Sequence, residues 1–249
     1  MLKRAYVWVM WRVRHVARAT GLLGPLDRWA DRSRIGLWLR TLLSIYDFED
    51  LRTFDVPWWT LVATRTVEEH LERRTDASVF EWGSGASTHW LAARCTHLMS
   101  VEHELYWAVR VGAELPDRAE VVVVEPDKLA GAEHAARSSK RGFTRLDFSR
   151  YVAAIDECTG PFDVIVIDGR AREACLTAAV RHLAPDGIIV FDDIERRRYR
   201  RAIAQVPSLQ VRWTFGVTPC VPYPAGTALL RHGHRPPTDP NGDPTSPMR

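Results

Sequence analysis

Cysteine is scarce in this sequence, and its spacing excludes two common classes of small domain. The four cysteines form no CxxC pair, and no histidine cluster lies beside them. This pattern favours neither a zinc site nor a disulfide framework. Because unpaired thiols are typical of a reducing compartment, we expect a cytoplasmic protein.

Long apolar runs and a large excess of one charge are also missing. No apolar run approaches the roughly 20 residues that cross a bilayer as a helix. Only three of the 34 basic residues are lysines, and 31 acidic residues leave a net charge of +3. A domain that binds nucleic acid is usually more basic than this, so we expect no nucleic-acid partner.

The 249 residues are sufficient for one α/β domain with extensions. Hydrophobic residues make up 46% and charged residues 26%, which excludes a collagen-like or wholly disordered chain. Residues 1–48 are rich in Arg and Trp and predict a helical extension. Residues 49–232 form the expected folded domain. Residues 233–249 are rich in Pro and predict a disordered tail.

The stretch Arg4–Arg18 predicts a basic amphipathic helix. At 100° per residue, its apolar side chains gather on one side: Tyr6, Val9, Met10, Val13, Val16 and Ala17. The other side carries basic residues, with Trp8 and Trp11 among them. Such a helix packs on the main domain, joins a second copy in a homodimer, or makes peripheral contact with an anionic membrane. The residues leave these alternatives open.

Short apolar segments alternate with helical patterns in the main domain. Pro57, with Asp55 just before it, indicates the start of a helix. Strands are expected at 78–81, 98–102, 120–125, 162–168, 187–192, 209–215 and 226–231. Helices are expected at 87–94, 105–114, 150–158, 172–183 and 195–205. Strands that are apolar on both faces and alternate with helices predict a doubly wound, mostly parallel seven-stranded sheet.

A glycine-containing turn follows the first expected strand and indicates a cofactor site. Ligands of doubly wound sheets bind at the carboxyl ends of the strands. Glu81 and Glu102 end the first two strands. This pair suits the ammonium and ribose hydroxyls of S-adenosyl-L-methionine (SAM), whereas Glu81 would repel the pyrophosphate of a dinucleotide. The expected SAM-binding residues are Glu81, Gly83, Ser84, Gly85, Ser87, Thr88 and Glu102.

Several motifs together resemble the Rossmann-like class of SAM-dependent methyltransferases. The resemblance spans about residues 57–231 and rests on FEWGSGAST, VEHE, FDVIVIDGRARE, LAPDGIIVFDDIE and FGVTPCVPYPAGTALLR. With FEDLRTFDVPWWT before the core, the pattern is similar to a family of small bacterial methyltransferase-domain proteins of unassigned substrate. The resemblance implies a SAM cofactor and an antiparallel final hairpin. No NPPY-type tetrapeptide follows the fourth strand, which disfavours methylation of nucleobase amines.

Acidic residues at the ends of the fourth and fifth strands mark the expected reacting centre. Methyl transfer needs an in-line approach and a base that takes the proton of the acceptor. The expected catalytic residues are Asp168, Asp192 and His103. Asp168, Asp192 and Asp193 form a candidate Mg²⁺ site, because neighbouring carboxylates repel unless a cation bridges them. This arrangement resembles the metal-dependent catechol-type O-methyltransferases, although an acid stands here at their amide position. Alternatively, these acids cap a helix or contact SAM.

The sequence therefore predicts a SAM-dependent methyltransferase that acts on a hydroxyl of a small molecule or glycan. Arg170 and Arg172 follow the fourth strand and are expected at the rim of the cleft, where they would hold an anionic group. One alternative is an NAD-dependent oxidoreductase, which Glu81 and the missing third glycine disfavour. The other alternative is a non-catalytic SAM-binding domain, docked to a membrane or partner by its N-terminal helix.

Overall fold

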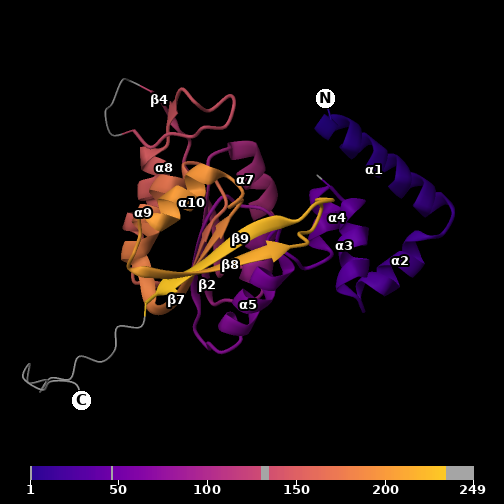
Figure 1. Cartoon of the computed structure of the whole chain (residues 1–249), viewed down its shortest axis with the longest axis horizontal. Coiled ribbons are helices and arrows are strands. Elements are labelled where there is room, and N and C mark those ends of the chain that lie inside the picture. Colours follow the sequence, from indigo (N-terminus) through magenta and orange to yellow (C-terminus); the bar gives the residue numbers. More distant parts are fainter. Residues whose placement is uncertain (1, 46, 130–134, 234–249) are drawn as a thin grey trace, which may run out of the picture.

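The computed structural model describes residues 2–45, 47–129 and 135–233 and has a seven-stranded sheet at its centre (Figure 1). The strands lie in the order β3-β2-β1-β6-β7-β9-β8. Their bounds are β1 (Ser78–Trp82), β2 (His97–Glu102), β3 (Ala119–Val123), β6 (Phe162–Ile167), β7 (Leu183–Asp192), β8 (Leu209–Gly216) and β9 (Ala225–His232). The first five are parallel, and β9 pairs antiparallel with both β7 and β8. The expected fold class is confirmed.

Helices cover both faces of this sheet, which explains why its strands are apolar throughout. They are α5 (Leu61–Leu71), α6 (Ala86–Ala92), α7 (Leu105–Gly112), α8 (Ser149–Ala153), α9 (Arg172–His182) and α10 (Arg197–Ala204). Alternate residues of β6 enter separate layers. Val164 and Val166 pack with residues of α5 and α6, whereas Ile165 and Ile167 pack with residues of α8, α9 and α10.

Local details differ from the expected boundaries. Pro57 does not begin a helix: α5 begins at Leu61, and the Thr60 hydroxyl accepts the N–H of Ala63 at 3.3 Å. The prediction at Pro57 was wrong because Thr60 supplies the side-chain acceptor that a helix N-terminus needs. The helix expected at 150–158 is the short α8, which continues as a 3₁₀ turn, η1 (Ala154–Glu157). Two short strands, β4 (Asp127–Lys128) and β5 (Leu146–Asp147), form a separate small sheet.

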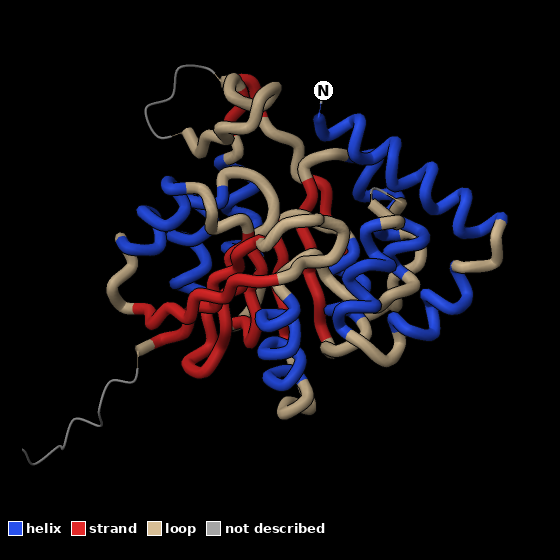
Figure 2. The backbone as a smooth tube through the Cα atoms, turned by 45° about the vertical axis from the view of Figure 1, so that its right-hand side comes forward, coloured by secondary structure: helices blue, strands red, loops and turns tan. Residues whose placement is uncertain are grey.

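Four helices precede α5 and the sheet and lie together at one end of the molecule (Figure 2). They are α1 (Leu2–Ala19), α2 (Leu23–Ala30), α3 (Arg34–Leu42) and α4 (Phe48–Arg52). Within the described part of the chain, no helix is both long and apolar enough to cross a membrane. The tail expected to be disordered falls, apart from Gly233, outside the described residues.

Helix α1 is rotated relative to its expected apolar stripe. Tyr6 and Met10 pack against a cluster that contains Ile45 and Leu51. Three other members of the predicted stripe face solvent, with exposed fractions of 42%, 45% and 58%: Val9, Val13 and Val16. The expectation of one buried apolar stripe was therefore half wrong, because the body of the protein covers only part of it.

Candidate functional site

The turns after β1 and β6 meet backbone to backbone where the strand order reverses. Gly83 has a φ of +98°, and a Cβ atom built on it would lie 2.6 Å from the Cα of Gly169. A Cβ on Gly169 would in turn lie 1.9 Å from the hydroxyl of Tyr151. Only glycine fits both positions. This close approach forms the floor of a cleft at the carboxyl ends of β1 and β6, the usual ligand position in such sheets.

Glu81 lies beneath this turn and does not face the cleft. Its side chain is 0% exposed, and its carboxylate accepts the hydroxyls of Ser87 at 2.5 Å, Thr88 at 2.6 Å and Ser100 at 2.7 Å. Burial raises the pKa of Glu81 to about 7. The expected contact with the ammonium of SAM stays a prediction, and in this geometry three hydroxyls of the chain already donate to the carboxylate.

The hydroxyl of Thr88, which donates to Glu81, also fixes the turn that precedes α6. The N–H of Gly85 donates to Oγ1 of Thr88 at 2.8 Å, and that hydroxyl donates to Glu81. Gly85 itself is extended, with φ of 175°, and a Cβ built on it would meet no atom within 4 Å. Glu81 and Thr88 therefore fix the turn from below and leave open space above Gly85.

Glu102 faces the cleft from the end of β2. One carboxylate oxygen, Oε1, accepts the backbone N–H groups of His103 at 2.6 Å and Glu104 at 3.1 Å. The other oxygen accepts only the Ser84 hydroxyl, at 3.4 Å. The Nδ1 atom of His103 also contacts Glu102, and the His103 ring packs on Phe143 with centroids 5.2 Å apart. Glu102 thus has one oxygen fixed by the backbone and one with capacity for a further donor.

Two neighbouring cavities, which share lining residues, occupy the cleft. The first has a volume of about 340 Å³ and is lined by residues that include Glu102, His103, Phe143 and Arg170. The second has a volume of about 380 Å³ and is mostly apolar. Four residues line both cavities: Gly83, Ser84, Trp107 and Asp168.

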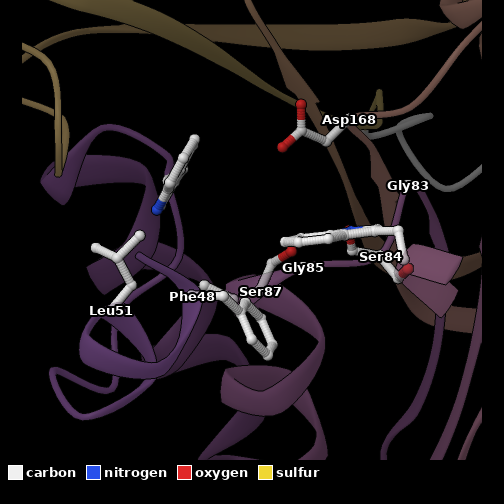
Figure 3. Close-up of a pocket in the computed structure, with 10 residues that line it drawn as sticks. Phe48, Leu51, Gly83, Ser84, Gly85, Ser87 and Asp168 are labelled. Carbon is white, nitrogen blue, oxygen red and sulfur yellow. The ribbon is translucent and has the colours of Figure 1, made fainter. Parts of the chain in front are cut away.

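The second cavity lies between the main domain and the N-terminal helices (Figure 3). Phe48 and Leu51 of α4 and Trp58 form its apolar side. Trp107 donates its indole N–H to the carbonyl of Ser84 at 2.8 Å and packs edge-on against Phe48. The carboxylate of Asp168 points into the space between these two sides. A small apolar or aromatic molecule would therefore lie beside a single carboxylate.

Asp168 is held by Arg172, four residues later. The Nη2 atom of Arg172 donates to Oδ1 of Asp168 and to its carbonyl, both at 2.7 Å. Burial raises the pKa of Asp168 to about 6, with a further contribution from the carboxylate of Asp193, whereas Arg172 lowers it. A carboxylate with such a pKa is ionised at neutral pH and is still able to accept a proton.

Arg172 is buried, not at the rim where it was expected. It is 5% exposed and also donates to the carbonyl of Gly169 at 3.1 Å and that of Asp192 at 2.7 Å. Its guanidinium lies 3.3 Å from Oδ2 of Asp193. Burial lowers the pKa of Arg172, but the carboxylates of Asp168, Asp193 and Asp192 raise it by more. This arginine therefore ties the ends of β6 and β7 together.

The three expected metal ligands do not form a metal site. Asp192 accepts the Thr227 hydroxyl at 2.8 Å, and burial raises its pKa well above the usual value. Asp193 is 40% exposed, with φ of +63°, and pairs with Arg172 and Arg196. Across the residues described, no group of three or more His, Cys, Asp or Glu is placed to hold a metal ion. The Mg²⁺ expectation is not supported, because the guanidinium of Arg172 already neutralises these carboxylates.

A comparison with known families matches residues 80–194 to a methyltransferase domain. This segment runs from β1 to the residues just after β7 and includes the glycine turn, Glu102 and Asp168. This part of the chain is therefore similar to a methyltransferase domain. A search of the curated proteins found none that matches the methyltransferase.

Two solved structures share the fold of the methyltransferase. An O-methyltransferase from Bacillus cereus, solved with SAH, is 18% identical with a TM-score of 0.52, over 78% of this chain and 90% of that one. The O-methyltransferase TomG from Streptomyces achromogenes, involved in tomaymycin synthesis and solved with SAM, is 16% identical with a TM-score of 0.51, over 77% and 89%. The predicted Rossmann-like fold is thus confirmed. Together with the matched domain, it supports a SAM-dependent methyltransferase over the oxidoreductase alternative.

Some residues of the methyltransferase site were not identified from the sequence. Phe143 lies far from the motifs along the chain, and Phe48 and Trp58 come from the segment before the core. Trp107 lies in α7, in a helical pattern that gives no indication of a ligand. Phe48 and Trp58 lie in the segment FEDLRTFDVPWWT, which contributes to the family resemblance but indicates no role in a site. For Phe143 and Trp107 the sequence signal is their aromatic character, which they share with core residues.

Proposed function

We propose that this methyltransferase transfers the methyl group of SAM to a hydroxyl of a small molecule or glycan, with Asp168 as the proton acceptor. The observation that carries the proposal is the position of Asp168 at the junction of the two cavities. The cofactor would take the first cavity, and the acceptor would take the apolar second cavity.

The residues of the first cavity fit the adenosine end of SAM. The Oε2 atom of Glu102, which accepts the Ser84 hydroxyl at 3.4 Å, would also accept the ribose hydroxyls, because Oε1 is fixed by two backbone N–H groups. His103 and Phe143 offer ring faces for a planar base. The open backbone at Gly83, Ser84 and Gly85 leaves room for the methionine end. When bound, SAM supplies a methyl group on a positively charged sulfur.

The apolar second cavity would position the acceptor and exclude water. Phe48, Leu51 and Trp58 offer an apolar surface on one side, and Asp168 offers a carboxylate on the other. An acceptor hydroxyl that donates to Asp168 would point its oxygen toward the glycine turn. Orientation of this kind supplies about 7–11 kcal/mol of the barrier in favourable cases.

Asp168 would take the proton that the acceptor oxygen loses as its new bond to the methyl carbon forms and the carbon–sulfur bond breaks, which would leave the sulfur neutral. The pKa of about 6 leaves Asp168 ionised at neutral pH, and Arg172 holds the carboxylate in place. The proton then leaves to water after the product dissociates. Asp192 and His103, the other expected bases, already have partners in Thr227 and Glu102, so we assign them no proton transfer.

Titration calorimetry with SAM, followed by methylation assays on a panel of phenols, alcohols, sugars and amines, tests the proposal. We expect SAM binding to weaken at least about tenfold in Glu102→Ala, which loses the proposed ribose acceptor. Binding should persist in the control Glu125→Ala, because Glu125 is exposed and lines neither cavity. EDTA should not change the rate. Wild-type protein that binds no SAM, or that methylates only amines, would contradict the proposal. Binding without turnover of any acceptor would favour a non-catalytic domain.

A further inference from the structure

One side of α1 is fixed to the body of the protein. Trp11 donates its indole N–H to the carbonyl of Ile45 at 3.0 Å. Arg14 pairs with Asp47 at 2.5 Å and with Asp50 at 3.2 Å. Together with the packing of Tyr6 in the apolar cluster, these contacts set the rotation of the helix. The opposite side is therefore presented to solvent in a defined orientation.

That opposite side combines apolar and basic side chains. We define the outer face of α1 as Trp8, Val9, Arg12, Val13 and Val16, which are all exposed. Trp8 is 60% and Val16 is 58% exposed. The guanidinium of Arg12 lies 5.1 Å from the centre of the Trp8 ring. Exposed apolar groups gathered on one helix face commonly mark an interaction surface.

The charge on α1 is of one sign. The helix contains no Asp or Glu between Leu2 and Ala19. Arg4 and Arg18 are exposed near its two ends, in addition to Arg12 within the outer face. The only acids that contact α1 through an ion pair in the described structure pair with Arg14 on the inner side. The outer face thus keeps its positive charge.

We propose that the outer face of α1 docks the protein on an anionic lipid bilayer. An indole and three valines would enter the headgroup region, while the arginines extend their charged ends to lipid phosphates. Basic side chains near such a surface are attracted by its negative potential. This inference does not rest on the proposed reaction.

A second copy of the chain fits this face less well. In a symmetric contact the same helix would lie on both sides of the interface. Because α1 has no acid, arginines would then face arginines without a partner. An anionic bilayer supplies the complementary charge along the whole helix. The inner side of α1 packs on the cluster that contains Leu51, and Leu51 lines the apolar cavity, so the bilayer would lie close to that cavity.

Co-sedimentation with vesicles tests the docking. The full-length protein is mixed with vesicles of equimolar phosphatidylcholine and phosphatidylglycerol, or of phosphatidylcholine alone. We expect binding to the anionic vesicles that falls as salt rises, and little binding to the neutral ones. Two variants test the outer face of α1. R4E/R12E/R18E reverses the charge of three arginines, and W8S/V16S removes two exposed apolar side chains. Each should lower the partition coefficient at least about tenfold.

A matched charge reversal on α10 provides the control. Arg197, Arg200 and Arg201 are exposed on that helix, so R197E/R200E/R201E makes the same change in net charge elsewhere. This control should bind vesicles as the wild type does. Equal loss in the control, or full binding by both α1 variants, would overturn the proposal.

Folding and self-association are measured on the same samples. Circular dichroism and SAM titration verify that each variant is folded. If the R4E/R12E/R18E protein does not fold, the W8S/V16S variant alone decides the test. This variant should fold because the side chains of Trp8 and Val16 are mostly exposed. Sedimentation velocity tests whether a second copy of the chain binds the outer face of α1 instead. A wild-type dimer that the α1 variants dissociate, with no binding to anionic vesicles, would replace the membrane by a second copy.

Discussion

Arg172 lies one helical turn after Asp168 and donates to it at 2.7 Å from within the protein. The sequence placed three carboxylates at this position and predicted a cation among them. In the structure, the guanidinium of Arg172 provides this positive charge. A guanidinium has a fixed planar set of donors, so it holds both a carboxylate and neighbouring carbonyls. Asp168 is thereby oriented without a metal ion.

Replacing Asp168 by Asn should abolish most of the methyl transfer while SAM still binds. A positioned base contributes typically about 10²–10⁴-fold in rate, and Asn cannot take the proton. Because the pKa of Asp168 lies at about 6 and its ionised form is the base, wild-type kcat/KM should rise with pH through about 6 and then level off. Stopped assays between about pH 5 and about pH 8 measure this pH dependence of kcat/KM. A flat wild-type profile, or a fully active Asn variant, would exclude Asp168 as the base.

Replacing Arg172 by Met should destabilise the fold. The variant leaves the buried carboxylates of Asp168 and Asp192 without their main opposite charge. Removal of one partner from a buried ion pair costs about 3–5 kcal/mol. Urea unfolding gives the loss. Arg170→Met is the control, since Arg170 lines the first cavity and, within the described structure, forms no ion pair with these acids. Equal stability of the two variants would contradict the assigned role of Arg172.

Replacing Glu81 by Gln should change the pH dependence of stability more than the affinity for SAM. The pKa of Glu81 is raised to about 7 in the folded state, from an ordinary value of 4.5. The folded state therefore binds the proton more tightly than the unfolded state. This contribution is full below pH 4.5 and is lost as pH rises through about 7.

Urea unfolding across that pH window compares wild type with Glu81→Gln. The free energy of unfolding of the wild type should fall more steeply with rising pH than that of the variant, because Gln does not titrate. The titration with SAM should give similar affinities, since Glu81 does not line either cavity. Two results would instead assign Glu81 to cofactor binding. One is a free energy of unfolding that depends on pH equally in both proteins, and the other is a large loss of SAM affinity without a loss of stability.

Substitution by Ala should lower stability at Gly83 and SAM affinity at Gly85. Gly83→Ala places a Cβ 2.6 Å from Gly169 at a φ of +98°, and such a backbone conformation alone costs about 1–3 kcal/mol. Gly85→Ala introduces no contact within 4 Å at an extended φ. We expect Gly83→Ala to lower the melting temperature, and Gly85→Ala to keep it while weakening SAM binding. A Gly85→Ala protein with normal SAM affinity would show that the cofactor does not occupy that space.

The sequence by itself determined the sheet and the strand-end position of Glu102. Strands buried on both faces are apolar at every position, so their pattern does not depend on the partners they meet. Glu102 ends such a strand, and the backbone N–H groups that fix it belong to the next two residues. Properties that depend only on neighbours along the chain were therefore predictable.

Only the tertiary structure decided the directions of Glu81 and Arg172 and the rotation of α1. Glu81 turns away from the cleft because Ser100, on the neighbouring strand, offers a hydroxyl there. Arg172 turns inward because β6 and β7 end side by side and present carboxylates to it. Val9 and Val16 remain exposed because Ile45 and Leu51 cover only part of the apolar stripe. Helical periodicity shows which residues share a face, but the surface that packs against that face comes from distant parts of the chain.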